Sequence, residues 1–532
     1  MTKVCVVHPY RRNVHKMYQS YFFEPERAVQ MATHLDESGI DVDFIDFGQT
    51  NLDDDHHFTV PVPREIRGHH NQMFHYGYPK QKIRTWFDDN GQDYDLYIVD
   101  ALTPYFREGV EFVVSRIPGQ PVLFFGEWPQ LVPEDFDAYP AVVDNWEEGA
   151  VQWVRGRPWE GGIHRFSFDE YPINDVAAPN WRKFTEEDDY PEPHNADYRA
   201  SRGCVERCDF CHVAGMYDGR FNFKSPEIII EDLEFLIEDQ GFTKIKLRDD
   251  NFCAATNTAK EVFRWIGDNH PDVEIMQPEG MEMRTASRDR DLIMQIGRCN
   301  YHSVRVGFET ATEGKFSKNS LEWWEQAHAW FKEAGFGPGE IFTFVIRGHP
   351  KMVRSDEIHT AIYLSQFDVT LVSGGYRLVP GTELWDDYVD EKGTDDIPYL
   401  YGLGLPNDDD MIDNVGRLYR TVTHWNNWGL NLFDDNALDK FSDLSWIESF
   451  EDHGDRIECS GTVSGWRRTE GIRYGFATRL AMRGYHVHQM TTDTKTEMEI
   501  VGKKGQNKFM SLVMECADDR GVAVEDPPGG LI

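Results

Sequence analysis

Short apolar runs alternate with helix-like segments over residues 1–155. The runs are rich in Val, Ile and Phe, which favours strands buried on both faces of a parallel sheet. Between the first two runs, Pro25 to Ser38 places Ala28, Met31 and Leu35 at helical spacing, and Gly39 is typical of a helix end. This alternation predicts a Rossmann-like α/β sheet. The predicted strands are Lys3 to Pro9, Asp41 to Phe47, Asp95 to Asp100, Pro121 to Phe125 and Ala141 to Asp144.

The stretch from Gln49 to Gly91 interrupts this alternation with aromatic residues, prolines and histidines. We interpret it as an insertion near a ligand site. Adjacent side chains on a strand or helix point apart, so solvated loop histidines are favoured over a metal site. The histidines are His56, His57, His69, His70 and His75.

A second series of strands and helices begins near Tyr198. Residues 156–197 are rich in Pro, Trp and acidic side chains without a clear period, which predicts a linker. Six strand and helix units over residues 198–405 then predict a parallel sheet curled into a partial barrel. Residues 406–532 are irregular and are expected to form a C-terminal accessory region. The predicted barrel strands are Tyr198 to Ser201, Lys244 to Leu247, Val273 to Gln277, Ser303 to Phe308, Ile341 to Ile346 and Val369 to Leu378.

The chain is strongly acidic. Its 532 residues include 54 Lys and Arg against 92 Asp and Glu, giving a formal net charge of -38. Such a field repels phosphate backbones, so nucleic acid is a poor partner. No apolar run approaches the roughly 18 residues that a membrane helix needs, and no signal peptide pattern is recognised. We therefore expect a cytoplasmic protein without a membrane partner.

Three of the eight cysteines crowd into one short segment. Cys204, Cys208 and Cys211 have the spacing C-x3-C-x2-C, so that one loop could surround a single metal centre of iron–sulfur or zinc type. A closed zinc site requires a fourth ligand, whereas three thiolates on a [4Fe-4S] cluster leave one iron open. The trio directly follows the first predicted barrel strand, where loops of such barrels carry reactive groups. We predict a [4Fe-4S] cluster, with zinc as the alternative.

The segment from Ser201 to Cys211, SRGCVERCDFC, resembles the signature of the radical S-adenosylmethionine (SAM) superfamily. The resemblance extends from about Tyr198 to about Tyr388. It implies that the open iron binds the amino and carboxylate groups of SAM, and that electron transfer breaks a carbon–sulfur bond to give a 5'-deoxyadenosyl radical. It also implies an electron donor such as flavodoxin or ferredoxin.

The same resemblance implies which residues bind SAM. Phe210 is the aromatic residue before the last cysteine, and Asp249 and Asp250 follow a strand where family members approach the methionine amino group. Glu309 ends a strand whose glutamate often lies near the ribose, although it could instead cap the next helix. Arg284 could pair with the cofactor carboxylate, and a structural salt bridge explains it equally well.

Parts of the first sheet resemble the cobalamin-binding domain that precedes the barrel in one radical SAM subgroup. The segments are Val122 to Pro129, Pro133 to Glu134, Val142 to Asp144 and Glu147 to Gly149, which agree in order and spacing. Two interpretations stay open, because the sheet could hold cobalamin or serve only as a scaffold.

The reaction that the resemblance implies depends on that cofactor. With cobalamin, we expect methylation of an unactivated carbon in a small-molecule or peptide substrate. Without methyl transfer, the same parts would support a cyclisation, rearrangement or oxidation. A non-catalytic iron–sulfur or zinc-binding scaffold is the alternative of another class.

Overall fold

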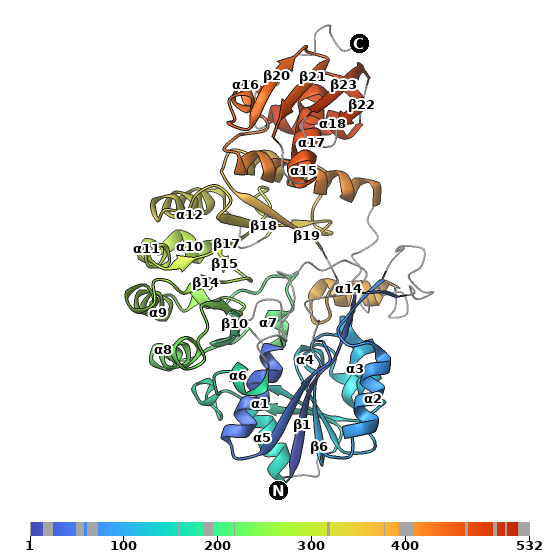
Figure 1. Ribbon diagram of the computed structural model, residues 1–532, viewed down its shortest axis with the longest axis vertical. Helices are drawn as coiled ribbons and strands as arrows, with labels where there is room; N and C mark the ends of the chain where they lie inside the picture. The colour runs from blue at the N-terminus through green and yellow to red at the C-terminus, as the bar shows by residue number, and fades with distance from the viewer. Residues whose placement is uncertain are drawn as a thin grey trace. The chain divides into compact units, whose positions relative to one another are not determined.

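The computed structural model describes most of the chain and divides it into two compact units. The first unit comprises Met1–Glu279, Arg298–Tyr301 and Arg377–Leu405, and the second comprises Gly280–Gly297, His302–Tyr376 and Pro406–Ile532 (Figure 1). The described residues are 2–13, 25–48, 58–60, 73–156, 160–185, 195–217, 219–316, 320–376, 378–392, 409–462, 466–492, 497–505 and 508–519.

The first unit begins with a parallel sheet of six strands in the order β3-β1-β6-β7-β8-β9. The strand order reverses between β1 and β6, and the ends of these two strands at His8 and Asp100 mark the edge where α/β sheets bind ligands. This sheet confirms the predicted α/β, Rossmann-like class. The strands are β1 (Lys3–His8), β3 (Asp41–Asp46), β6 (Leu96–Asp100), β7 (Val122–Phe125), β8 (Pro140–Asp144) and β9 (Gly162–Phe166).

Helices cover both faces of this sheet, which is why its central strands are apolar at successive positions. Val4 and Val6 of β1 pack in a core with α1 (Glu26–Glu37) and α5 (Trp146–Gly156) on one face. Cys5 and Val7 pack on the opposite face with α2 (Lys80–Asn90) and α3 (Arg107–Val114). Figure 1 shows these two layers of helices around the blue strands.

Several further short elements complete this part of the first unit. The strands β2 (Arg11–Asn13), β5 (Met73–Tyr76) and β4 (Phe58–Val60) form a small antiparallel sheet. His75 belongs to β5, whereas the other four histidines of the predicted insertion lie outside the described residues. Two short helices follow, α4 (Glu127–Leu131) and α6 (Trp181–Phe184).

A second parallel sheet of the first unit has four strands in the order β10-β13-β14-β16. The helices α8 (Pro226–Glu234) and α9 (Thr256–Asn269) lie side by side along it (Figure 1). The strands are β10 (Asn195–Tyr198), β13 (Lys244–Leu247), β14 (Glu274–Met276) and β16 (Asn300–Tyr301). A short antiparallel pair, β11 (Ser201–Gly203) with β12 (Phe221–Phe223), follows β10, and α14 (Glu383–Lys392) completes the unit.

The second unit contains another parallel sheet, in the order β15-β17-β18-β19. Its strands are β15 (Met281–Glu282), β17 (Val304–Glu309), β18 (Ile341–Arg347) and β19 (Thr370–Gly375). Its helices are α10 (Met283–Arg288), α11 (Arg290–Arg298), α12 (Leu321–Glu333) and α13 (Arg354–Leu364). β17, β18 and β19 coincide closely with three predicted barrel strands, whereas β15 was not predicted.

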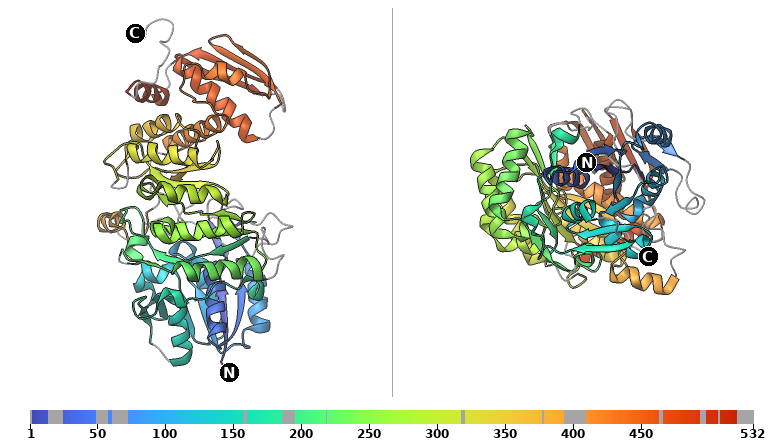
Figure 2. Two further views of the ribbon diagram at one scale, coloured as in Figure 1. Left: turned by 90° about the vertical axis from the view of Figure 1, so that its left-hand side faces the viewer. Right: turned by 90° about the horizontal axis from the view of Figure 1, so that it is seen from below.

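The C-terminal part of the second unit is an antiparallel sheet with helices. The sheet order is β20-β21-β23-β22, and α17 packs along β22 and β23, as the left view of Figure 2 shows. The strands are β20 (Ile447–Asp452), β21 (Arg456–Gly461), β22 (Tyr485–Thr492) and β23 (Glu497–Lys504). The helices are α15 (Asp409–Asn427), α16 (Ala437–Ser442), α17 (Trp466–Met482) and α18 (Lys508–Asp519). Among the described helices, none combines the length and apolar character needed to span a membrane.

Candidate functional site

The three cysteines lie on the loop that connects β11 to β12. All three are partly exposed. Gly203 begins this loop with a φ of 94°, and a Cβ there would lie 2.1 Å from the carbonyl oxygen of Arg220, so only glycine fits. The turn closes with a hydrogen bond of 3.1 Å from the Cys211 amide to the Cys208 carbonyl. A short helix, α7 (Val213–Met216), follows directly.

The loop after β13 supports the backbone that leads to Cys204. The carboxylate of Asp249 accepts hydrogen bonds from the Ala200 amide at 3.0 Å and from the Ser201 hydroxyl. Asp250 accepts one from the Gly203 amide at 3.3 Å.

The next residue of this support loop reaches a cysteine. The Asn251 side-chain amide donates a hydrogen bond to the Cys204 sulfur at 3.6 Å. Hydrogen bonds of this kind to cysteine sulfur are among the features that tune iron–sulfur clusters. The predicted SAM-binding acidic loop therefore also braces the cysteine loop.

The two adjacent aspartates differ in environment. Asp249 is fully buried, and burial raises its pKa to about 7 although the Ser201 hydrogen bond opposes this shift. The side chain of Asp250 keeps 17% of its exposure and lies 3.7 Å from the Arg199 guanidinium. Asp250 is therefore the better placed of the two to meet a cofactor, and the SAM-binding role of both stays a prediction.

The remaining predicted cofactor residues are divided between the units. Phe210 lies beside Cys211 and is partly buried in the first unit. In the second unit, Arg284 of α10 stacks over the Trp323 ring at 5.6 Å. Glu309 ends β17 with a φ of 64° and is only 5% exposed, an uncommon backbone state for a residue with a side chain. Their contacts with SAM stay predictions.

Both ends of the cysteine loop contact side chains of the N-terminal sheet and its helices. Arg202 precedes Cys204 by two positions, and its Nη2 lies 2.9 Å from Glu147 Oε1. His212 follows Cys211, and its Nε2 lies 3.6 Å from Glu127 Oε2. Burial by itself would raise the pKa of Glu127, but Arg27 and His212 outweigh it and lower that pKa to about 2.

The sequence did not predict these contacts. Each of them joins residues at least 55 positions apart, so no local spacing could reveal it.

A small charged pocket lies where β1 and β6 end. Several of its buried side-chain polar atoms have no hydrogen-bond partner among the described residues; they include the acceptors Glu26 Oε1 and Asp100 Oδ1 and the donors Arg27 Nη1 and Arg199 Nε. Buried polar atoms are normally satisfied, so such a set of donors and acceptors indicates a ligand or water. The pocket is lined by His8, Arg11, Pro25, Glu26, Arg27, Asp100, Leu102, Asp197, Arg199 and Arg248.

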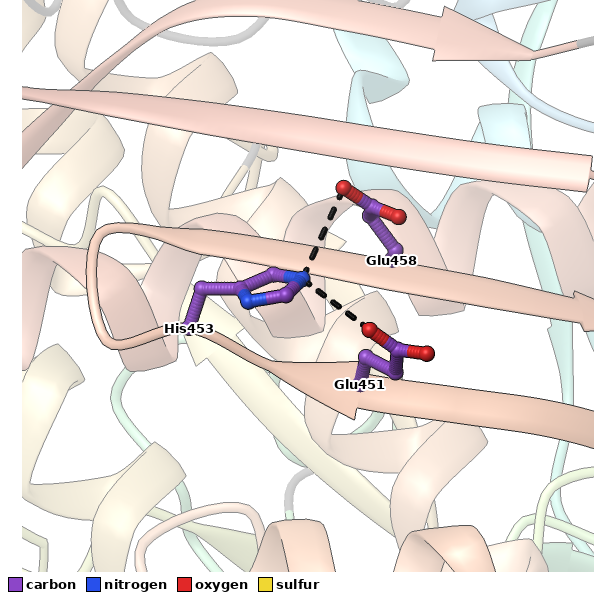
Figure 3. A group of neighbouring side chains, drawn as sticks. All are labelled: Glu451, His453 and Glu458. Atoms are coloured by element: carbon purple, nitrogen blue, oxygen red, sulfur yellow. Dashed lines mark ion pairs between the residues drawn. The ribbon is translucent and has the colours of Figure 1, made fainter.

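A separate group of side chains gathers at the turn between β20 and β21 (Figure 3). His453 Nε2 lies 3.4 Å from Glu451 and 3.6 Å from Glu458. The Arg456 guanidinium already pairs with Glu458 at 2.5 Å, and all these side chains are at least partly exposed. An exposed ion-pair network accounts for this group.

Comparison with known families identifies the central part of the chain. Residues 198–358 match the model of the Radical SAM superfamily. This segment is a radical SAM domain. It contains all three cysteines, both aspartates of the support loop, Arg284 and Glu309.

Two curated relatives carry methyltransferase names. The uncharacterized methyltransferase PH0819 of Pyrococcus horikoshii is 25% identical over 189 residues, which cover 35% of this chain and 40% of the relative. The uncharacterized methyltransferase sll1242 of a Synechocystis species is 23% identical over 117 residues, 21% of each chain. The matched part thus spans less than half the length of either relative.

Two solved structures of TsrM, a radical SAM methyltransferase from Kitasatospora setae, share the fold. Both have a TM-score of 0.54 and cover 74% of this chain, at 15% and 14% identity. They cover 76% and 78% of the TsrM chain. One contains tryptophan substrate and a SAM analogue, and the other contains cobalamin and a [4Fe-4S] cluster. At this identity the likeness establishes the fold alone.

Proposed function

We propose that this protein is a radical SAM enzyme that uses a [4Fe-4S] cluster and cobalamin to methylate an unactivated carbon. The observation that carries the proposal is the cysteine loop of the radical SAM domain, where Asp250 accepts a hydrogen bond from the Gly203 amide and Asn251 donates one to the Cys204 sulfur. When bound, the cluster would supply the electron that cleaves SAM to the 5'-deoxyadenosyl radical.

The donor set fits a cluster held by three thiolates. Cys204, Cys208 and Cys211 are partly exposed, which leaves room for a ligand on one side. The neighbouring imidazole of His212 directs Nε2 toward Glu127, whereas a structural zinc site requires a fourth protein ligand. The N–H donated by Asn251 to Cys204 suits a thiolate, because a negatively charged sulfur is a better acceptor than a thiol.

The edge of the N-terminal sheet offers chemistry that suits cobalamin. The rim of that cofactor carries primary carboxamides, which both donate and accept hydrogen bonds. The pocket at the end of β1 and β6 presents unsatisfied donors and acceptors together. Gly126 adopts a φ of 114° at the end of β7, where a Cβ would lie 2.7 Å from the Ala101 carbonyl oxygen. These features support a ligand at this edge, and the cofactor found in TsrM supports the choice of cobalamin.

The chain's own residues would have distinct tasks. The three cysteines hold the cluster, and Asp250 is placed to accept a hydrogen bond from the methionine amino group of SAM. Asp249 and Asn251 maintain the loop geometry. The substrate is a small molecule or peptide, and its carbon would lose a hydrogen atom and gain a methyl group.

Anaerobic reconstitution of the full chain with iron and sulfide, with and without hydroxocobalamin, tests this proposal. The protein is gel-filtered and then incubated with dithionite and SAM. We expect retained corrinoid, together with both 5'-deoxyadenosine and S-adenosylhomocysteine. Cys208→Ala should lose 5'-deoxyadenosine, and Cys253→Ala, which removes a buried cysteine outside the loop, should retain it.

The alternatives give different results in the same experiment. Deoxyadenosine without retained corrinoid or S-adenosylhomocysteine would refute methyl transfer and favour a cyclisation, rearrangement or oxidation. A colourless protein that binds zinc and no iron would leave only a scaffold role.

A further inference from the structure

Arg202 is a buried arginine in the strand that leads into the cysteine loop. It is 2% exposed, and its backbone pairs with Asn222 across β11 and β12. Its side chain contacts the N-terminal sheet's helices, where Nη2 donates to Gln30 Oε1 of α1 at 2.8 Å and to Glu147 Oε1 of α5 at 2.9 Å. The guanidinium also lies over the Trp146 ring at 5.1 Å.

These contacts fix the direction of the Arg202 side chain. Glu147 is 1% exposed and Gln30 is fully buried, so water does not compete for the guanidinium. A buried ion pair adds little net stability compared with an apolar pair of similar volume, because both charges must be desolvated. A planar guanidinium held between two acceptors and an aromatic ring instead has a fixed orientation.

The backbone from Arg202 to Cys204 can transmit this geometry because it has little freedom. Gly203 occupies the space against the Arg220 carbonyl, and its amide is held by Asp250. Cys204 follows at once and accepts the hydrogen bond from Asn251. A shift of Arg202 would therefore move the Cys204 sulfur relative to its N–H donor.

We propose that Arg202 is a positioning residue through which Glu147 and Gln30 of the N-terminal domain set the place of Cys204 in the cluster site. This inference rests on the proposed [4Fe-4S] cluster. It gives the N-terminal domain a role in the radical SAM site that does not depend on bound corrinoid. Some groups orient a metal ligand without binding the metal themselves. Replacing such a group changes metal affinity or activity by roughly 10–100-fold.

The test compares reconstituted full-length variants by cluster spectroscopy. Glu147→Gln keeps the size of the side chain but removes its charge, and Arg202→Lys keeps a charge but removes the planar fork. Arg298→Lys is the matched control, since Arg298 forms an exposed ion pair with Asp268 outside the cysteine loop. Iron content, the electron paramagnetic resonance g-values of the reduced cluster, its midpoint potential and the thermal midpoint are measured for each protein.

We expect Glu147→Gln and Arg202→Lys to shift the g-values and the midpoint potential, and to lower the rate of 5'-deoxyadenosine formation about tenfold. Arg298→Lys should match the wild type. If Arg202→Lys fails to fold, Glu147→Gln decides the question with the same readouts.

Two results separate this inference from the proposed function. Variants with a lower thermal midpoint but unchanged g-values, potential and rate would overturn the positioning role and leave Arg202 as a stabilising residue. A wild-type protein without a cluster would instead overturn the proposed function, and with it the inference.

Discussion

The buried carboxyl of Asp249 gives a pH dependence that can be worked out from the structure. Burial raises its pKa from the ordinary value of 3.8 to about 7 in the folded chain. The folded state therefore holds this proton over a pH range in which the unfolded state has released it. The stability that this proton contributes is fully present below the unfolded pKa, and it is lost as the pH rises through the folded pKa.

The replacement Asp249→Asn removes this dependence with little change of shape. Asn keeps an oxygen that can accept from the Ala200 amide and the Ser201 hydroxyl, and its amide nitrogen would replace Asp249 Oδ2, which forms no hydrogen bond with the described residues. With the two pKa values above, the linkage relation predicts how the free energy of unfolding changes with pH. Between about pH 5 and pH 8, that of the wild type should fall by about 2.6 kcal/mol relative to that of the variant.

The assay is urea unfolding of the cluster-free chain at several pH values. Unfolding is monitored by hydrogen–deuterium exchange of peptides from β10, β11 and β13. The difference between wild type and variant cancels the titration of groups common to both. Asp272→Asn, at an exposed position, is the control for replacing a carboxylate by an amide. A difference that stays constant with pH, or that favours the wild type as the pH rises, would refute the reasoning.

Two further replacements test the packing around the site. Gly126→Ala should cost about 1–3 kcal/mol, because Gly126 has a φ of 114° and a Cβ would meet the Ala101 carbonyl oxygen; thermal unfolding should show this loss, and an unchanged melting temperature would contradict it. Lys224→Met should cost about 3–5 kcal/mol, because Lys224 is 1% exposed and donates to Asp232 at 2.7 Å, leaving that carboxylate without its cation. The double variant Lys224→Met with Asp232→Asn removes the unpaired charge and keeps an acceptor for the buried Tyr198 hydroxyl. It should recover most of the stability measured by urea unfolding, and no recovery would show that the unpaired charge is not the cause.

Hydrophobic runs predicted the buried strands well, because such strands need apolar residues on both faces. β1 and β6 therefore appear close to the predicted limits. β9 (Gly162–Phe166) was not predicted and lies within the segment expected to be a linker. It was missed because it is a half-exposed edge strand that contains His164 and Arg165 and shows no apolar run.

β10 shows a different reason for a shifted limit. It begins earlier than predicted, at Asn195, because its buried polar residues are satisfied by partners from elsewhere. Asp197, for example, lies 3.4 Å from Arg248 Nε.

The candidate site divides in the same way between local and distant information. The cysteine spacing lies within one loop, so the sequence predicts it directly. Arg202 is held by Glu147 and by Gln30, which lies 172 positions earlier. No periodicity marks such a pair, and only the fold shows that the N-terminal helices meet the cysteine loop.

The measurement that tests the central claim most directly is the iron and sulfide content of the anaerobically reconstituted protein, combined with electron paramagnetic resonance of the reduced protein with and without SAM. The account predicts about four iron and four sulfide ions per chain, a signal that changes when SAM is added, and loss of that signal in Cys208→Ala. A protein that binds no iron, or a cluster retained in full by Cys208→Ala, would contradict it.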